Sequence, residues 1–247
     1  MKKIKLVWQE YNIGMKGERY MLATIYNFQD FKENLYKAGM STGGVNNEGV
    51  FSLCDYYGDT IQWHTEDADT DPWEWRMRVL NEETDIAYGK FFFKKSGYIT
   101  REWYPYFYAV RRGDRELEEE YENGNISLFA RKIYRLLTEY KELPLHLIKQ
   151  YGGFSAEDKA RFDAAMTELQ MKFYITMCGR ARKTSKAGEE YGWSSTVFCL
   201  TEDFFGKEII KEALKIKPDD AYEKIYQWIN RLNAGANPKK VSKFIKG

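Results

Sequence analysis

The sequence predicts an α+β protein, in which an aromatic-rich N-terminal α+β region is followed by a winged-helix domain and a C-terminal helix. Two patterns support this class. Residues 125–200 read as three closely linked helical segments followed by two alternating strands, and the preceding half mixes helix and strand signals. Aromatic residues make up 17% of the 247-residue chain, which excludes compositional disorder. We expect three units, at 1–113, 125–205 and 206–247.

The N-terminal region contains two helix signals separated by a segment of another kind. Apolar residues follow one stripe over 27–39, which ends in a glycine. The motif Asp71-Pro72-Trp73-Glu74 supplies an N-cap, a proline at the first helical position and an acid at N3, and it predicts a helix over about 72–83. The segment 45–63 lacks helical periodicity and predicts strands and turns. The aromatic run 103–108 is expected to be mostly buried.

An acidic stretch over 112–125, with six acids among fourteen residues, predicts a solvated linker or a frayed helix end. Five elements then follow in the order of a winged helix. They are a helix from Asn125 or Ser127 to Tyr140, a helix over 145–151, a third helix capped by Ser155, and strands over 172–178 and 194–200. An amphipathic helix is expected over 219–232.

Composition limits the classes of function. The 38 Lys and Arg nearly balance the 37 Asp and Glu, so binding to nucleic acid would need a local basic patch. The three cysteines lack metal-ligand spacing and are typical of reduced thiols. No apolar run is long enough to cross a bilayer, and the first residues lack the apolar core of a signal peptide. We therefore expect a cytoplasmic protein with no cofactor, no metal and no membrane partner.

The loop between the two predicted strands is the first candidate site. Five basic residues and no acid lie between Lys172 and Gly188. The candidate nucleic-acid-binding residues are Arg180, Arg182, Lys183 and Lys186. A basic loop of this kind suits contacts with phosphates, although an ordinary solvated hairpin tip has a similar composition.

The third predicted helix has the opposite charge. It carries four acids against two bases: Glu157, Asp158, Asp163 and Glu168 against Lys159 and Arg161. A net negative helix would repel the DNA backbone, so we do not expect it to read a groove in the usual winged-helix manner. The same surface would suit a basic protein partner.

The segment 63–76 is the second candidate site. His64 beside Glu66 and Asp69 could form a proton-transfer pair, which makes His64 and Asp69 the candidate catalytic residues. The candidate ligand-stacking residues are Trp63, Trp73, Trp75 and Arg76, the last of which could also hold an anion. The alternative is that Asp71 and Glu74 merely cap a helix, the tryptophans belong to the core and the rest is solvated loop.

The alternating acids at the start of this segment do not form a calcium loop. A loop beginning at Asp67 would need glycine at its sixth position and a bidentate glutamate at its twelfth. The sequence has Pro72 and Arg78 there.

Several motifs together resemble a group of bacterial proteins related to the AlkZ/YcaQ DNA glycosylases. They are Trp63-His64-Thr65, Asp71-Pro72-Trp73-Glu74-Trp75-Arg76, Phe91-Phe92-Phe93, Glu102-Trp103-Tyr104-Pro105, Ala165-Met166-Thr167-Glu168-Leu169-Gln170 and Cys178-Gly179-Arg180. The resemblance covers roughly residues 60–205. It implies a winged-helix protein with DNA as its partner, close to enzymes that remove alkylated or crosslinked bases.

The chain departs from those enzymes at their catalytic motif. The glycosylases resemble one another in a Gln-x-Gln or Gln-x-Asp motif that positions the attacking water. None of the glutamines here has Gln or Asp two residues further on: they are at 9, 29, 62, 150, 170 and 227. Two hypotheses follow, a winged-helix DNA-binding protein without that motif and a non-catalytic module for a protein partner or small ligand.

Overall fold

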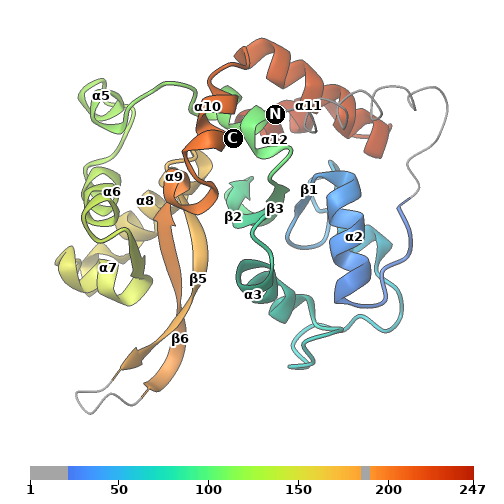
Figure 1. Cartoon of the computed structure of the whole chain (residues 1–247), viewed down its shortest axis with the longest axis horizontal. Coiled ribbons are helices and arrows are strands. Elements are labelled where there is room, and N and C mark those ends of the chain that lie inside the picture. The colour runs from blue at the N-terminus through green and yellow to red at the C-terminus, as the bar shows by residue number, and fades with distance from the viewer. Residues whose placement is uncertain (1–21, 185–189) are drawn as a thin grey trace, which may run out of the picture.

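The computed structural model describes residues 22–184 and 190–247 (Figure 1). The N-terminal part comprises α2 (Phe28–Ala38), β1 (Met40–Thr42), the 3-10 helix η1 (Leu53–Tyr56), α3 (Pro72–Glu82), β2 (Ile86–Phe92), β3 (Lys95–Thr100) and α4 (Tyr104–Arg111). The middle part comprises α5 (Leu117–Glu122), α6 (Leu128–Tyr140), β4 (Glu142–Pro144), α7 (Leu145–Tyr151), the 3-10 helix η2 (Ala156–Asp158), α8 (Lys159–Met171), β5 (Ile175–Thr184) and β6 (Glu190–Leu200). The C-terminal part comprises α9 (Thr201–Phe205), α10 (Lys207–Ala213), α11 (Pro218–Leu232) and α12 (Pro238–Lys246).

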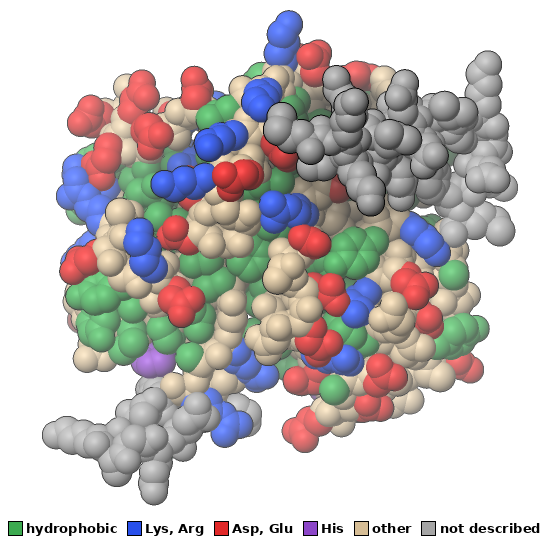
Figure 2. Space-filling model, in the orientation of Figure 1, with side chains coloured by type: hydrophobic (Ala, Val, Ile, Leu, Met, Phe, Trp, Pro, Cys, Tyr) green, Lys and Arg blue, Asp and Glu red, His purple; other side chains and the backbone are tan. Residues whose placement is uncertain are grey.

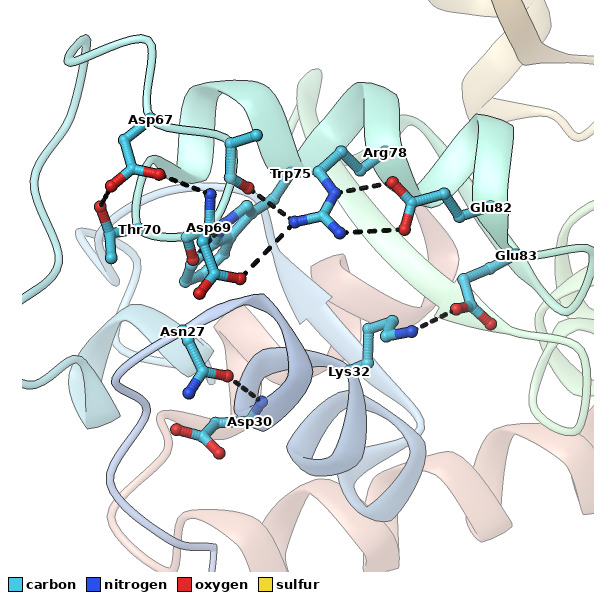
Figure 3. Close-up of polar contacts among 11 residues, drawn as sticks. Asn27, Asp30, Lys32, Asp67, Asp69, Thr70, Trp75, Arg78, Glu82 and Glu83 are labelled. Carbon is cyan, nitrogen blue, oxygen red and sulfur yellow. Dashed lines mark hydrogen bonds and ion pairs between the residues drawn. The ribbon is translucent and has the colours of Figure 1, made fainter.

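The predicted helices are confirmed, and capping side chains set their ends, at Asp71 and Ser155 as expected and also at Asn27 and Ser127. At the start of α2, the side-chain oxygen of Asn27 accepts the backbone N–H of Asp30 at 2.9 Å (Figure 3). Gly39 ends that helix in the left-handed region, with φ of 79°. Ser127 caps α6, and Ser155 with Asp158 forms a capping box before α8. Local sequence chemistry therefore fixes where these helices begin and end.

The strands predicted within 45–63 were wrong. This segment forms turns and η1, and among the described residues its β-type pairing is limited to an isolated bridge between Tyr57 and Ile25. Side chains satisfy backbone groups that a strand would have paired: Asn46 accepts the N–H of Val50 at 3.0 Å, and Ser52 donates to the carbonyl of Gly44 at 2.7 Å.

The acidic stretch 112–125 contains the short helix α5 and is anchored. Leu117 is buried in the core beneath α6. The Glu118 carboxylate accepts hydrogen bonds from Arg131 at 2.7 Å and from Arg135 at 2.9 Å, both on α6. This connection is therefore held against the winged-helix segment by one apolar anchor and a pair of arginines.

One antiparallel sheet runs through both halves of the molecule in the order β1-β3-β2-β5-β6-β4. Strands β1 to β3 come from the N-terminal region. The β5–β6 hairpin and β4, which pairs with β6, complete the winged-helix order of α6, β4, α7, α8, β5 and β6. The two groups of strands meet where Tyr88 of β2 lies opposite Met177 of β5.

Two apolar clusters lie on either side of that junction. One is formed by α6–α8 and the strands beside them, and Met177 packs against both clusters. The other combines the N-terminal region with residues of α10–α12, and the rings of Phe92 and Phe244 stack 3.9 Å apart. The C-terminal part therefore contains α9, α10 and α12 besides the helix predicted over 219–232, and α12 closes the N-terminal core. No helix in the described ranges has the length and apolarity needed to cross a membrane.

A buried arginine connects these parts. The Arg111 guanidinium donates to the carbonyl oxygens of Phe91 (2.5 Å), Met171 (3.3 Å), Phe244 (2.5 Å) and Ile245 (2.7 Å). These carbonyls belong to β2, α8 and α12. Burial lowers the pKa of Arg111 to about 9, so the group remains charged at neutral pH.

We expect Arg111→Met to lower the free energy of unfolding by about 3 kcal/mol, because it leaves several buried carbonyl oxygens without a donor. Urea denaturation of both proteins measures this change. The control is Arg161→Met, which removes an exposed guanidinium paired with Asp158 and should cost at most about 1 kcal/mol. Equal losses in the two variants would show that Arg111 does not connect the three elements.

The contacts of Glu118 predict an unusual titration. Hydrogen bonds from Arg135 and Arg131 lower the pKa of the Glu118 carboxyl to about 2, against 4.5 for an unperturbed group. The stabilisation that comes from pairing the Glu118 carboxylate with the two arginines is thus complete above pH 4.5, and it is lost as the pH falls towards 2. An NMR titration of the carboxyl carbon should give a value near 2, and Arg135→Gln should raise it. A value near 4.5 in the unchanged protein would contradict the pairing.

Candidate nucleic-acid interface

The β5–β6 hairpin is longer than the sequence predicted and projects beyond the helices (Figure 1). Its strands have 10 and 11 residues and span roughly 30 Å, at about 3.3 Å per residue. Arg180 lies opposite Thr196 and Lys183 opposite Tyr191, so the basic residues Arg180, Arg182 and Lys183 belong to strand β5 and not to the connecting loop. Backbone pairing therefore continues through the basic stretch and presents it on an extended arm.

The basic residues of this arm differ in their surroundings. The Arg180 guanidinium donates to the hydroxyl of Ser194 on β6, and its Nη1 lies 3.9 Å from Oε2 of Glu74 on α3. Arg182 is exposed to solvent. Lys186 and the side chain of Lys183 lie outside the described residues.

The three cysteines are unpaired, as the sequence predicts. Cys178 and Cys199 lie across the base of the hairpin, where Cys178 occupies an irregularity in the register of β5 with β6. The hydrogen bond with Cys178, together with burial, raises the pKa of the Cys199 thiol well above its ordinary value. This thiol is therefore held protonated and weakly reactive.

The Asp71 carboxylate organises the loop that precedes α3. Its Oδ1 accepts the N–H of Trp73 at 2.7 Å, and its Oδ2 accepts the N–H groups of Thr65 at 2.9 Å and Glu66 at 3.2 Å. His64 and Glu66 both have a left-handed backbone, each with φ of 63°. Burial alone would raise the pKa of Asp71, but the surrounding backbone N–H groups lower it below its ordinary value. One buried side chain thus caps the helix and fixes the turn before it.

This turn presents four of the candidate residues as a row, which we call the aromatic ladder: Trp63, His64, Trp73 and Arg76. The ring centroids of Trp63 and His64 are 6.4 Å apart, and those of His64 and Trp73 are 4.9 Å apart. The Arg76 guanidinium lies over the Trp73 ring at 3.3 Å from its centroid. Trp63 and Trp73 remain 39% and 41% exposed. Three side chains of the ladder and the guanidinium of Arg76 therefore form one continuous surface.

Trp75 has a different position from the other two tryptophans of the segment. It is fully buried, its ring N–H donates to the carbonyl of Asp69 at 3.1 Å, and its ring packs 4.9 Å from that of Phe31. Trp75 is therefore a core residue and not a ligand-stacking residue, because a ligand has no access to its buried ring.

The two candidate catalytic residues are not joined. The carboxylate of Asp69 faces Arg78, whose Nη1 lies 3.7 Å from Oδ1 (Figure 3). Arg78 also donates to both oxygens of Glu82 and to the carbonyl of Ala68. No hydrogen bond between His64 and Asp69 occurs among the described residues, so the expected proton-transfer pair is not assembled in this conformation.

The acids near α8 are largely engaged with neighbouring groups. Asp158 pairs with Arg161 at 2.5 Å, Asp163 with Lys159 at 3.1 Å, and Glu168 accepts from the hydroxyl of Ser127 at 2.7 Å. These contacts give Asp158, Asp163 and Glu168 local partners, but the four acids still outnumber the two bases, so the surface keeps a net negative charge.

The C-terminal half of α8 is covered by the N-terminal region. Gln170 accepts the backbone N–H of Lys90 on β2 at 2.9 Å, and the ammonium group of Lys90 reaches Thr167 at 3.3 Å. This half of the helix therefore cannot enter a DNA groove in the observed arrangement.

The contact between Arg180 and Glu74 could not be found from the sequence, because the two residues lie 106 positions apart in the chain. It brings the base of the basic arm next to α3, so the two candidate sites are neighbours. Figure 2 shows basic side chains beside the hairpin and a group of acidic side chains along the adjoining edge of the same face. Within the described ranges, no group of three or more His, Cys, Asp or Glu side chains is arranged to hold a metal ion.

A family model for AlkZ-related proteins matches residues 25–246. The chain belongs to the AlkZ-related family. The match includes the N-terminal core, the hairpin and the C-terminal helices of this AlkZ-related protein, a longer stretch than the 60–205 that the sequence motifs covered. No curated protein and no solved structure matches the chain.

We expect Asp71→Ala to lower the free energy of unfolding by about 2 kcal/mol, because the change removes a helix cap and three hydrogen bonds. Since the folded-state pKa of Asp71 is depressed, its contribution is present above the unfolded pKa and is lost as the pH falls through the folded value. Denaturation as a function of pH measures both effects.

The matched control is Asp69→Asn, which changes an exposed carboxylate of the same loop and should cost less than about 1 kcal/mol. If Asp71→Ala were as stable as this control at pH 7, Asp71 would not be the residue that fixes the loop.

Proposed function

We propose that this AlkZ-related protein binds duplex DNA, and that the β5–β6 hairpin provides the principal contacts. The observation that carries the proposal is the projecting arm with exposed basic side chains, in a chain whose family is named for its relation to AlkZ. Arg180, Arg182, Lys183 and Lys186 contact phosphates, which supply affinity without reading the sequence. The unit expected at 125–205 is then the DNA-binding module, between the units expected at 1–113 and 206–247.

In this proposal the third helix of the winged helix does not read the major groove. Its C-terminal half packs on β2, and its exposed half carries more acids than bases, which repels a phosphate backbone. The duplex is therefore approached by the arm, with its backbone as the feature recognised.

We propose binding and not base excision. The glutamine motif of the AlkZ glycosylases is missing from the sequence, and His64 and Asp69 do not form a pair. A role in DNA repair follows from the family resemblance, and a cytoplasmic location agrees with three unpaired thiols.

Fluorescence anisotropy of a labelled duplex at several salt concentrations tests this function. We expect binding by the unchanged protein at about 50 mM salt that weakens steeply towards about 200 mM. Arg180→Gln/Arg182→Gln should weaken binding and reduce the slope of log affinity against log salt by about 2, one for each lost phosphate contact.

The control is Lys215→Gln/Lys217→Gln, which removes two exposed positive charges between α10 and α11, at the other end of the molecule from the hairpin (Figure 1). It should leave the slope unchanged. Absence of binding by the unchanged protein at low salt, or equal losses in both variants, would refute the role of the arm.

A further inference from the structure

We propose that the aromatic ladder is a stacking site for a single unpaired nucleobase, so that the protein prefers duplexes containing unpaired bases. This inference rests on the proposed function, because the arm must first hold the duplex beside the ladder. It adds the class of DNA that is recognised.

The first support is the exposure of large rings on a fixed backbone. Trp63 and Trp73 are each about two-fifths exposed, whereas Trp75 and Trp103 are buried in the core. In this loop His64 and Glu66 both have the left-handed backbone conformation, which L-residues rarely adopt. The Asp71 carboxylate holds the loop in this conformation through its hydrogen bonds to the N–H groups of Thr65 and Glu66. Strain kept at an exposed site by a buried carboxylate is typical of a site whose geometry serves binding.

The second support is the arrangement of the rings. Trp73 lies in the middle of the ladder, between His64 and the guanidinium of Arg76. Trp63 is the exposed aromatic end and Arg76 the half-buried cationic end. Nucleobases stack on indole rings and on guanidinium planes alike, so a planar base can extend or enter this row.

The third support is the negative charge of the loop, which limits the kind of ligand that the ladder can bind. Glu66, Asp67 and Asp69 are exposed on the same loop. Asp67 accepts from the N–H of Asp69 and the hydroxyl of Thr70, both at 2.9 Å, which holds its negative charge in the loop between His64 and Trp73 (Figure 3). These acids repel a phosphate backbone but tolerate an uncharged base. A strand running across the ladder is therefore disfavoured, and one base presented from a neighbouring duplex is favoured.

The fourth support is the position of the ladder relative to the arm. Glu74, which follows Trp73 in α3, lies 3.9 Å from Arg180 at the base of the hairpin. A duplex held by the phosphate contacts of Arg180 thus passes next to Trp73. An organic cation is a poorer ligand, because the guanidinium of Arg76 already covers a face of Trp73 and would repel it.

The test compares three labelled DNAs of one sequence: a paired duplex, the same duplex with an internal bubble of unpaired bases, and the single strand. We expect the unchanged protein to bind the bubble duplex roughly tenfold more tightly than the paired one, with quenching of tryptophan fluorescence. Trp73→Ala and, separately, Trp63→Ala should bring the affinity ratio close to one. Tyr151→Ala, which removes an equally exposed ring from α7, should keep the ratio.

The outcomes separate this inference from the proposed function. Binding of the paired duplex with no preference for the bubble overturns the ladder as a base site and leaves the arm as the DNA contact. Tightest binding to the single strand overturns the inference as well, because it requires a backbone to cross the acidic loop. Failure to bind any of the three DNAs overturns the proposed function together with the inference. Urea denaturation of each variant establishes that a changed ratio does not come from unfolding.

Discussion

The guanidinium of Arg111 is buried at the point where three separate stretches of the chain meet. It reaches carbonyl oxygens of β2, of α8 and of the end of α12, and the rings of Phe92, Phe107 and Phe173 surround it. A buried charge is tolerated only when its donors are satisfied, so the three stretches must come together for Arg111 to be stable. This requirement joins the winged-helix segment and the C-terminal helices to the N-terminal sheet.

The candidate interface depends on a second buried charge, that of Asp71. Its carboxylate begins α3 and at the same time holds the preceding turn, so the exposed rings of Trp63 and Trp73 are positioned by the core and not by a free loop. Because α3 packs beside β5, the turn lies near the base of the basic arm through the contact of Glu74 with Arg180. The two candidate sites, the basic arm and the loop before α3, are thus neighbours on elements that pack together.

Charge is distributed unevenly over this surface. The arm offers basic side chains to solvent, two of the acids around α8 pair with bases of the same helix, and the loop before α3 keeps its acids exposed. Phosphates would therefore be attracted to the arm and repelled from the ladder, while an uncharged ring is accepted there. This division of charge is consistent with the proposed recognition of DNA by its backbone and by a single unpaired base, without the groove-reading helix that most winged helices use.

The sequence by itself determined the local elements. Asn27, Asp71, Ser127 and Ser155 mark helix starts because capping involves residues only two or three positions apart, and the order of elements over 127–200 predicted the winged helix. Only the tertiary structure decided that one sheet joins both halves, that α12 closes the N-terminal core, that Trp75 is buried while Trp73 is exposed, and that Glu74 meets Arg180. The burial of a ring and the partner of a charge depend on contacts between residues far apart in the chain, and neither periodicity nor capping chemistry contains that information.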